Sequence, residues 1–170
     1  MLAAIILVIF PFCMAFAAIS DMISMTIANR ISIVLAVTFL LVAPMTGMDW
    51  STYAWHLAAG ALVLAVTFGF FAVGGMGGGD AKLLAATALW MGMSMSILFY
   101  LVYAALVGGA LTVLILLYRK SALSVYTGHM LLLRNFADKD VGVPYGIALA
   151  IGGILAFPTT TLAQWAMANF

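Results

Sequence analysis

The sequence predicts an all-α, polytopic membrane protein with about six transmembrane helices and with both termini outside. Hydrophobic residues make up 67% of the 170 residues and charged residues only 6%, with no glutamate, which is far from the composition of a soluble domain. The apolar residues form runs of about 20, the length that crosses a bilayer core of roughly 30 Å. The basic residues all fall in segments that this map places on one side.

We expect the spans to form one domain over residues 1–170. The first run, 2–20, resembles a signal peptide, but the first basic residue, Arg30, lies on its far side, so we expect a retained helix. The second run is short and extends to 47, with Pro44 near its end. The expected spans are 2–20, 31–47, 53–73, 81–92, 96–118 and 143–165.

The apolar stretch 81–118 is the one segment that can be read as one helix or as two. One helix would be about 57 Å long at 1.5 Å per residue, too long for a single crossing, so we expect a turn near Gly92. Six spans place 20–30, 74–82 and 119–142 in the cytoplasm. These three segments hold every basic residue of the chain: Arg30, Lys82, Arg119, Lys120, Arg134 and Lys139. A single span would move the last four to the other side, against the positive-inside rule.

Two further features bear on this topology. Indole rings favour the headgroup region, and four tryptophans fall toward the outer face: Trp50, Trp55, Trp90 and Trp165. The polar segment 119–142 is either a helix lying in the cytoplasmic interface or an ordinary loop. Its apolar residues are Leu123, Tyr126, Met130, Leu131 and Leu133.

Composition also limits the classes of function. Six basic residues spread along the chain make no patch for nucleic acid. The single cysteine, Cys13, lies in an apolar run, which excludes a disulfide within the chain and a CxxC metal site, and we interpret it as a packing residue. His56 and His129 fall on opposite faces without a second ligand at metal spacing, so we assign neither a role and expect no metal site.

The candidate site consists of two aspartates, Asp21 and Asp80. Asp21 follows the first span, and Asp80 ends a glycine cluster, 74–80, directly before the fourth span. An ionised carboxylate near hydrocarbon is costly unless it is paired, solvated or protonated. The map places both acids at the cytoplasmic boundary, where helix packing can bring them together. Such a pair shares a proton, so the charged member can activate a water while the protonated member polarises a peptide carbonyl.

The same residues also allow structural interpretations. Asp80 can be the N-cap of the fourth span, with the glycines as a flexible turn, and Asp21 can be a solvated loop acid. In the functional interpretation, the glycines let a substrate strand approach the backbone beside Asp80. Lys82 is either a snorkelling anchor at the boundary or a residue of the site.

Residues 77–85, GGGDAKLLA, resemble the GxGDxKLxA signature of the type IV prepilin peptidases, which are membrane aspartyl proteases of bacteria. The segment 27–29, Ile-Ala-Asn, resembles the hydrophobic-Pro-Asn turn that follows the first catalytic aspartate in that family, with alanine in place of proline. The segment 143–146, Val-Pro-Tyr-Gly, resembles the closing element of the family. The resemblance implies a site that needs no cofactor, with Asp21 and Asp80 catalytic and with these supporting residues: Gly77, Gly79, Lys82 and Asn29.

The resemblance also implies a substrate and a location. The compact form is similar to the peptidases that serve Flp-type pili, whose prepilin substrates have a basic cytoplasmic leader and a hydrophobic helix in the membrane, with cleavage near their junction. We therefore expect a partner that is a pilin-like precursor, a place in the bacterial cytoplasmic membrane and an active site facing the cytoplasm. Larger members also methylate the new N-terminus and carry an insertion with paired cysteines. This chain has one cysteine and no such segment, so methyltransferase activity is not expected.

Three alternatives remain beside this interpretation. A proton-coupled transporter would use intramembrane acids and small-residue helix contacts, such as the stripes Ala104/Gly108/Thr112 and Ala148/Gly152/Ala156, but its acids should lie near the midplane. Presenilin-like proteases share GxGD, but they place the first aspartate in the preceding helix and carry a Pro-Ala-Leu element, which this chain lacks. A membrane scaffold of a pilus assembly would not need Asp80 at all.

Overall fold

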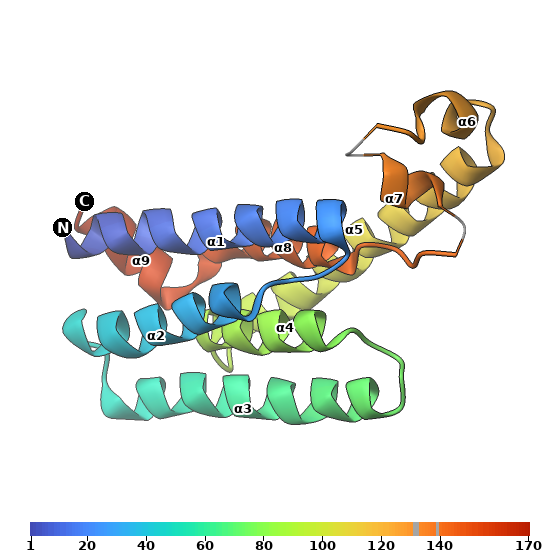
Figure 1. Ribbon diagram of the computed structural model, residues 1–170. Helices are drawn as coiled ribbons and strands as arrows, with labels where there is room; N and C mark the ends of the chain where they lie inside the picture. The colour runs from blue at the N-terminus through green and yellow to red at the C-terminus, as the bar shows by residue number, and fades with distance from the viewer. Residues whose placement is uncertain (131–132, 139) are drawn as a thin grey trace.

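The computed structural model describes residues 1–130, 133–138 and 140–170. These residues form helices joined by short connections, so the predicted all-α class is confirmed. Figure 1 shows the longer helices side by side in a bundle, with the short α6 and α7 projecting beyond its end. The elements are α1 (Leu2–Ser24), α2 (Asn29–Met45), α3 (Trp50–Ala72), α4 (Gly78–Met91), α5 (Met95–Lys120), α6 (Leu123–Thr127), α7 (Arg134–Ala137), α8 (Tyr145–Ala156), the 3-10 helix η1 (Phe157–Thr159) and α9 (Thr161–Ala168).

The core of the bundle is organised around α4, which packs against α2, α3, α5 and α8. The ring of Trp90 in α4 is fully buried and lies 5.1, 6.1 and 6.2 Å from the rings of Phe10, Phe39 and Phe157. Its indole N–H donates to the carbonyl oxygen of Leu35 in α2 at 3.0 Å. Lipid tails are as apolar as these side chains, so close packing and interhelical hydrogen bonds, each worth about 0.6–2 kcal/mol, hold such helices together.

Trp90 corrects the expectation that all four tryptophans face the outer interface. Trp50 and Trp55 are 77% and 59% exposed, as residues at an interface would be, whereas Trp90 is in the core. Its polar N–H is satisfied by a backbone carbonyl instead of by lipid headgroups.

The stripes of small residues on α5 and α8 bring these two helices into close contact. A Cβ atom at Gly152 would lie 2.7 Å from the backbone nitrogen of Ala104, so only glycine permits this approach. The stripes therefore serve helix packing, as expected for small residues between membrane helices.

The helices indicate a multi-pass membrane protein. In the described residues, α1, α3 and α5 are long and apolar enough to cross a bilayer, and α8, η1 and α9 together make a fourth candidate if the bent pair is one span. The apolar α2 has 17 residues, and α4, with 14 residues, is about 21 Å long, which is shorter than a bilayer core of about 30 Å. The predicted number of six spans therefore stays a prediction.

The predicted segments agree with the observed helices within a few residues, except for the last one. The expected span 143–165 is not one straight helix, because α8 ends at Ala156 and α9 begins at Thr161 after a bend of 56°. Pro158 lies in the turn between them, where it lacks the backbone N–H that a continuous helix needs. The Thr160 side chain then caps α9 by accepting a hydrogen bond from the Ala163 amide.

The polar segment 119–142 contains no single interfacial helix in its described part. Helix α5 continues to Lys120, and the short α6 and α7 follow it. Leu131 and Lys139 lie outside the described residues. The Arg119 guanidinium fixes the segment to the end of α5 by donating, at 2.8–3.0 Å, to the carbonyl oxygens of Phe136, Val141 and Gly142.

Both chain termini lie at the same end of the bundle in Figure 1. The end of α1, the start of α4 and the end of α5 lie at the other end. This arrangement is what an even number of crossings requires. On which side of the membrane either end lies stays a prediction.

Candidate active site

The structure brings Asp21 and Asp80 together, although they are far apart in the chain. Both line one cavity of about 260 Å³, formed by the end of α1, the connection to α2 and the start of α4. Three of the predicted supporting residues, Asn29, Gly77 and Gly79, line the same cavity. We call it the aspartate cavity. Its three elements meet at the end of the bundle opposite the two termini (Figure 1).

Asp21 lies in the last turn of α1, because this helix continues to Ser24 instead of ending at residue 20 as expected. Its side chain is only 5% exposed, so the interpretation as a solvated loop acid is wrong. One carboxylate oxygen, Oδ2, accepts a hydrogen bond of 2.7 Å from the backbone N–H of Gly146. That N–H belongs to the first turn of α8, where helix amides have no partner within the helix and favour an anion.

Gly146 contacts Asp21 but is not among the residues that the sequence motifs predict to support the site. A Cβ atom there would lie 2.8 Å from Oδ2 of Asp21 and 2.7 Å from Cδ1 of Ile27, so a larger residue would push α8 away from the carboxylate. The signal for it was present in the sequence. The Val-Pro-Tyr-Gly element at 143–146 marks this helix start, but the sequence does not reveal which residue the glycine contacts.

Asp80 lies in the first turn of α4, whose N-cap is Gly77 and which has no side-chain cap. The alternative that Asp80 caps this helix is therefore wrong. Its Oδ1 atom is buried and has no hydrogen-bond partner in the described part of the chain. A buried polar atom without a partner is uncommon in a folded protein, so helix packing alone does not account for this carboxyl group.

Asp49 shows how a capping aspartate looks in the same molecule. It is the N-cap of α3, and its carboxylate accepts hydrogen bonds of 3.0 Å from the amides of Ser51 and Thr52 and of 2.7 Å from the Thr52 hydroxyl. These hydrogen bonds, first of all the one from the Thr52 side chain, lower the pKa of Asp49. Asp80 makes no such hydrogen bonds to the amides at the start of α4, so helix capping does not explain why an aspartate stands at this position.

Ile27, in the α1–α2 connection, packs between Gly79 of α4 and Gly146 of α8. It is 7% exposed. A Cβ atom at Gly79 would lie 3.2 Å from Cβ of Ile27 and 3.3 Å from its backbone nitrogen and oxygen. On its other side, Ile27 touches Gly146. The two glycines thus let α4 and α8 approach the α1–α2 connection closely, and this approach sets the distance between the two aspartates.

The α1–α2 connection keeps a backbone that suits the family's proline. Ala28, which stands in the proline position, has φ −64° and ψ 130°, and proline fixes φ near −65°. The turn begins at Met25, which has the left-handed φ of 53° at the end of α1. Hydroxyl groups stabilise it, since Ser20 donates to the carbonyl oxygen of Thr26 at 2.8 Å. The backbone at Ala28 is therefore compatible with proline.

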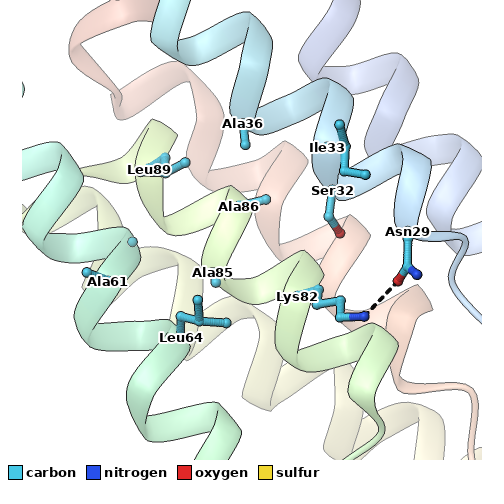
Figure 2. A pocket seen from close by; sticks show the side chains of 11 residues that line it. Asn29, Ser32, Ile33, Ala36, Ala61, Leu64, Lys82, Ala85, Ala86 and Leu89 are labelled. Atoms are coloured by element: carbon cyan, nitrogen blue, oxygen red, sulfur yellow. Dashed lines mark hydrogen bonds between the residues drawn. The ribbon is translucent and has the colours of Figure 1, made fainter.

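Asn29 and Lys82 form a pair at the edge of the aspartate cavity. The Lys82 ammonium donates to Oδ1 of Asn29 at 2.9 Å (Figure 2). Asn29 lines the aspartate cavity, whereas Lys82 lines a neighbouring groove. Lys82 thus ties the start of α4 to the start of α2, and it reaches the site through Asn29.

Asn135 in α7 is a second residue that the sequence did not reveal. It is 9% exposed, and its Nδ2 donates to the carbonyl oxygens of Met22 and Ile23 at 2.9 Å each. These carbonyls belong to the last turn of α1, which has no helical donors for them. Asn135 therefore fixes the turn that carries Asp21. No local pattern predicts a contact between residues more than 100 positions apart.

The arrangement offers two different oxygens to a bound group. Asp21 is held by an amide that favours its charged form, and Asp80 presents an oxygen without a partner. Two carboxylates facing one small cavity repel each other when both are charged, so a proton shared between them relieves the repulsion. One acid and one base beside a cavity are what general acid–base chemistry on a water requires.

Neither histidine lines this cavity. His56 is buried between helices, where its Nδ1 lies 2.6 Å from the carbonyl oxygen of Leu89. In the described residues, no three His, Cys, Asp or Glu side chains lie together as a metal site would need. Independence from metal ions and cofactors stays a prediction that a chelator can test.

Comparison with curated proteins and with solved structures gave no match. The model of the type IV leader peptidase family matches residues 8–120, about two thirds of the chain. This stretch includes both aspartates, the α1–α2 connection and the glycine cluster before α4. The chain therefore belongs to the type IV leader peptidase family.

Proposed function

We propose that this chain, as one peptidase domain over residues 1–170, is an aspartyl endopeptidase of the bacterial cytoplasmic membrane. Its substrate is a Flp-like prepilin, from which it removes the cytoplasmic leader. The observation that carries the proposal is the aspartate cavity, where two acids from distant helices meet with different hydrogen bonding. Membership of the family supports peptide-bond hydrolysis as the reaction, and Asp21 and Asp80 in the cavity are the residues that we propose for it. Methyltransferase activity is not part of this proposal.

The two aspartates divide the work by their surroundings. Asp21 is charged and accepts a hydrogen bond from the Gly146 amide. It takes a proton from a water molecule while the oxygen of that water attacks the scissile carbonyl carbon. Asp80, protonated, donates from its carboxyl group to the carbonyl oxygen and stabilises the tetrahedral intermediate. Asp21 then passes its proton to the leaving nitrogen as the C–N bond breaks, and Asp80 recovers its proton from the new carboxyl group.

The position of the cavity supports this substrate. It lies where α1 ends and α4 begins, at the end of the bundle rather than halfway along it (Figure 1). The junction between a polar leader and an apolar membrane helix lies at the same depth. A transporter needs its acids near the midplane, so the geometry favours the peptidase over that alternative.

The test is co-expression with a Flp-type prepilin, followed by sequencing of the N-terminus of the pilin. Asp21→Asn and Asp80→Asn keep the size of the side chain but remove its titratable proton, so each alone should lower cleavage below detection. The double variant should be no worse, because residues acting as one unit are not additive. Cleavage should also survive a chelator.

Asp49→Asn and Asp138→Asn are the matched controls, since neither residue lines the aspartate cavity. Both should keep near-normal cleavage. Normal cleavage by purified Asp80→Asn protein would exclude the catalytic pair, and it would leave a scaffold or another active site to explain the family match.

A further inference from the structure

A second, larger hollow lies beside the aspartate cavity. It is an open groove of about 490 Å³ between α2, α3 and α4, and Figure 2 shows the side chains that line it. Small residues from all three helices form its walls, among them Ala36, Ala61 and Ala85. Its polar lining residues are Asn29, Ser32 and Lys82. We call it the small-residue groove.

The small-residue groove and the aspartate cavity share one lining residue, Asn29. Lys82, which lines the groove, donates a hydrogen bond to Asn29. From Lys82 the groove extends along α4 to Leu89, which is about 10 Å at 1.5 Å per residue. One end therefore lies at Asn29, on the edge of the aspartate cavity, and the rest runs along apolar helices toward the other end of the bundle.

Ser32 places a polar atom without a partner in the wall of the groove. Its side chain is 8% exposed, and its hydroxyl oxygen has no hydrogen-bond partner in the described residues. In Figure 2 this hydroxyl points from α2 toward α4, into the groove. A lipid tail offers no group that can pair with a hydroxyl, whereas the backbone of a helix offers carbonyl oxygens, each with a second lone pair beside its helical hydrogen bond.

The walls also suit a helix. Alanine and glycine residues allow the backbones of membrane helices to approach closely. Close packing of this kind is one of the interactions by which such helices associate in lipid. Gly60 of α3 adds to the small residues of this face. A helix packed here along α4 would have one end beside Asn29 and Lys82.

On the basis of the function proposed above, we propose that the small-residue groove binds the apolar helix of the precursor. The helix packs against α2, α3 and α4, and its N-terminal end delivers the scissile bond to Asp21 and Asp80. Binding of the helix and cleavage of the bond are then separate functions of neighbouring surfaces, so each can be removed without the other.

The first experiment fills the groove. Ala61→Phe and Ala36→Phe place a ring in it from α3 and α2, and Ala105→Phe, on an exposed position of α5, is the matched control. Each protein cleaves two substrates, the complete precursor and a soluble peptide that spans the scissile bond but ends before the apolar helix. We expect kcat/KM for the precursor to fall at least tenfold, mainly through KM, with peptide cleavage unchanged and with Ala105→Phe equal to wild type.

Equal loss for both substrates, or loss for neither, would overturn the proposal. A second measurement does not depend on peptide cleavage. Ala61 is replaced by benzoylphenylalanine in the Asp80→Asn protein, and the sample is irradiated with the precursor in lipid vesicles. The crosslink should map to the apolar helix of the precursor by mass spectrometry. Crosslinks to lipid alone, or to the leader alone, would contradict helix binding.

The two proposals fail in different ways. If wild-type protein cleaves no precursor but the crosslink to its helix forms, the groove is a helix-binding site and the peptidase assignment is wrong. If the precursor is cleaved normally in the Ala61→Phe and Ala36→Phe proteins, the peptidase stands and the groove does not hold the substrate.

Discussion

At the scale of single residues, Gly146 decides how closely α8 approaches Asp21. Its amide donates to the Asp21 carboxylate, and a Cβ atom there would lie 2.8 Å from the accepting oxygen. Gly146→Ala should therefore displace the carboxylate and lower kcat by about 100-fold, since a displacement near 1 Å has effects of this order. Prepilin cleavage under saturating substrate measures it.

Gly109→Ala is the control for this substitution. Gly109 is also a helical glycine, but a Cβ atom there would have no neighbour within 4 Å. The Gly109→Ala protein should cleave at the wild-type rate. If Gly146→Ala does so as well, the hydrogen bond between its amide and Asp21 is not part of the active geometry.

Ala28 gives a prediction about stability. Its φ of −64° is the value that proline imposes, and it stands where the family has proline. Ala28→Pro should thus restrict the unfolded chain without straining the folded one and raise the free energy of unfolding by about 0.4–1 kcal/mol. Thermal unfolding in detergent measures this, with cleavage expected to persist.

Ala58→Pro, in the middle of α3, provides the opposite case. There proline removes a helical hydrogen bond and clashes with the preceding turn, which costs about 3 kcal/mol or more. If Ala28→Pro lowers the stability as much as Ala58→Pro does, the prediction is wrong. A favourable φ at residue 28 would then not be enough for the α1–α2 connection to accept proline.

Among single residues, the sequence revealed those that follow a local pattern. Asp80, Gly77 and Gly79 were recognisable because a run of glycines before an acid is unusual between apolar segments. Gly146 was visible only as part of a motif. Its contact with Asp21 depends on how α8 packs against α1, which no spacing along the chain encodes.

At the scale of elements, the α7 segment acts as a clamp on α1. Asn135 donates to two carbonyl oxygens in the last turn of α1, and Arg119 holds the segment to α5. Asn135→Ala would leave both carbonyls without their donor, so the turn that carries Asp21 would fray. We expect kcat to fall about tenfold, with little change in KM and with a shift of the pH optimum of cleavage.

Thr127→Ala tests whether any damage to this segment has the same effect. The Thr127 hydroxyl lies 2.6 Å from the Tyr118 hydroxyl, and it therefore stabilises the segment without reaching α1. This variant should keep the kcat and the pH optimum of the wild type. Equal effects in the two variants would show that the segment acts through its overall folding instead of through Asn135.

Most elements were predictable because apolar runs and their polar ends are local features. The ends were less accurate, since a polar residue such as Asp21 can lie inside a helix when the protein provides it with a partner. The break at Pro158 does not follow from the proline alone, because Pro11 lies inside the continuous α1 and Pro44 lies inside α2. The short helices of 119–142 could not, because they are held by Arg119 and Asn135 through carbonyls distant in sequence.

At the scale of the whole molecule, the ends of the bundle differ in chemistry. The aspartate cavity and the hydrogen bonds of Arg119 lie at one end, and both termini lie at the other (Figure 1). If the basic residues face the cytoplasm, the cavity does too, and it can meet a leader that has never crossed the membrane. The orientation of the bundle therefore decides which substrates can reach the site.

Labelling of single cysteines tests this orientation in intact cells. The parent protein is Cys13→Ala. A membrane-impermeant thiol reagent should not label Ser124→Cys in α6. The basic residues around α6 predict that this segment lies in the cytoplasm. It should label Thr46→Cys and Ser51→Cys, which lie between α2 and α3 or at the start of α3. Labelling at position 124 from outside would place the aspartate cavity away from the cytoplasm, where an uncleaved leader could not reach it.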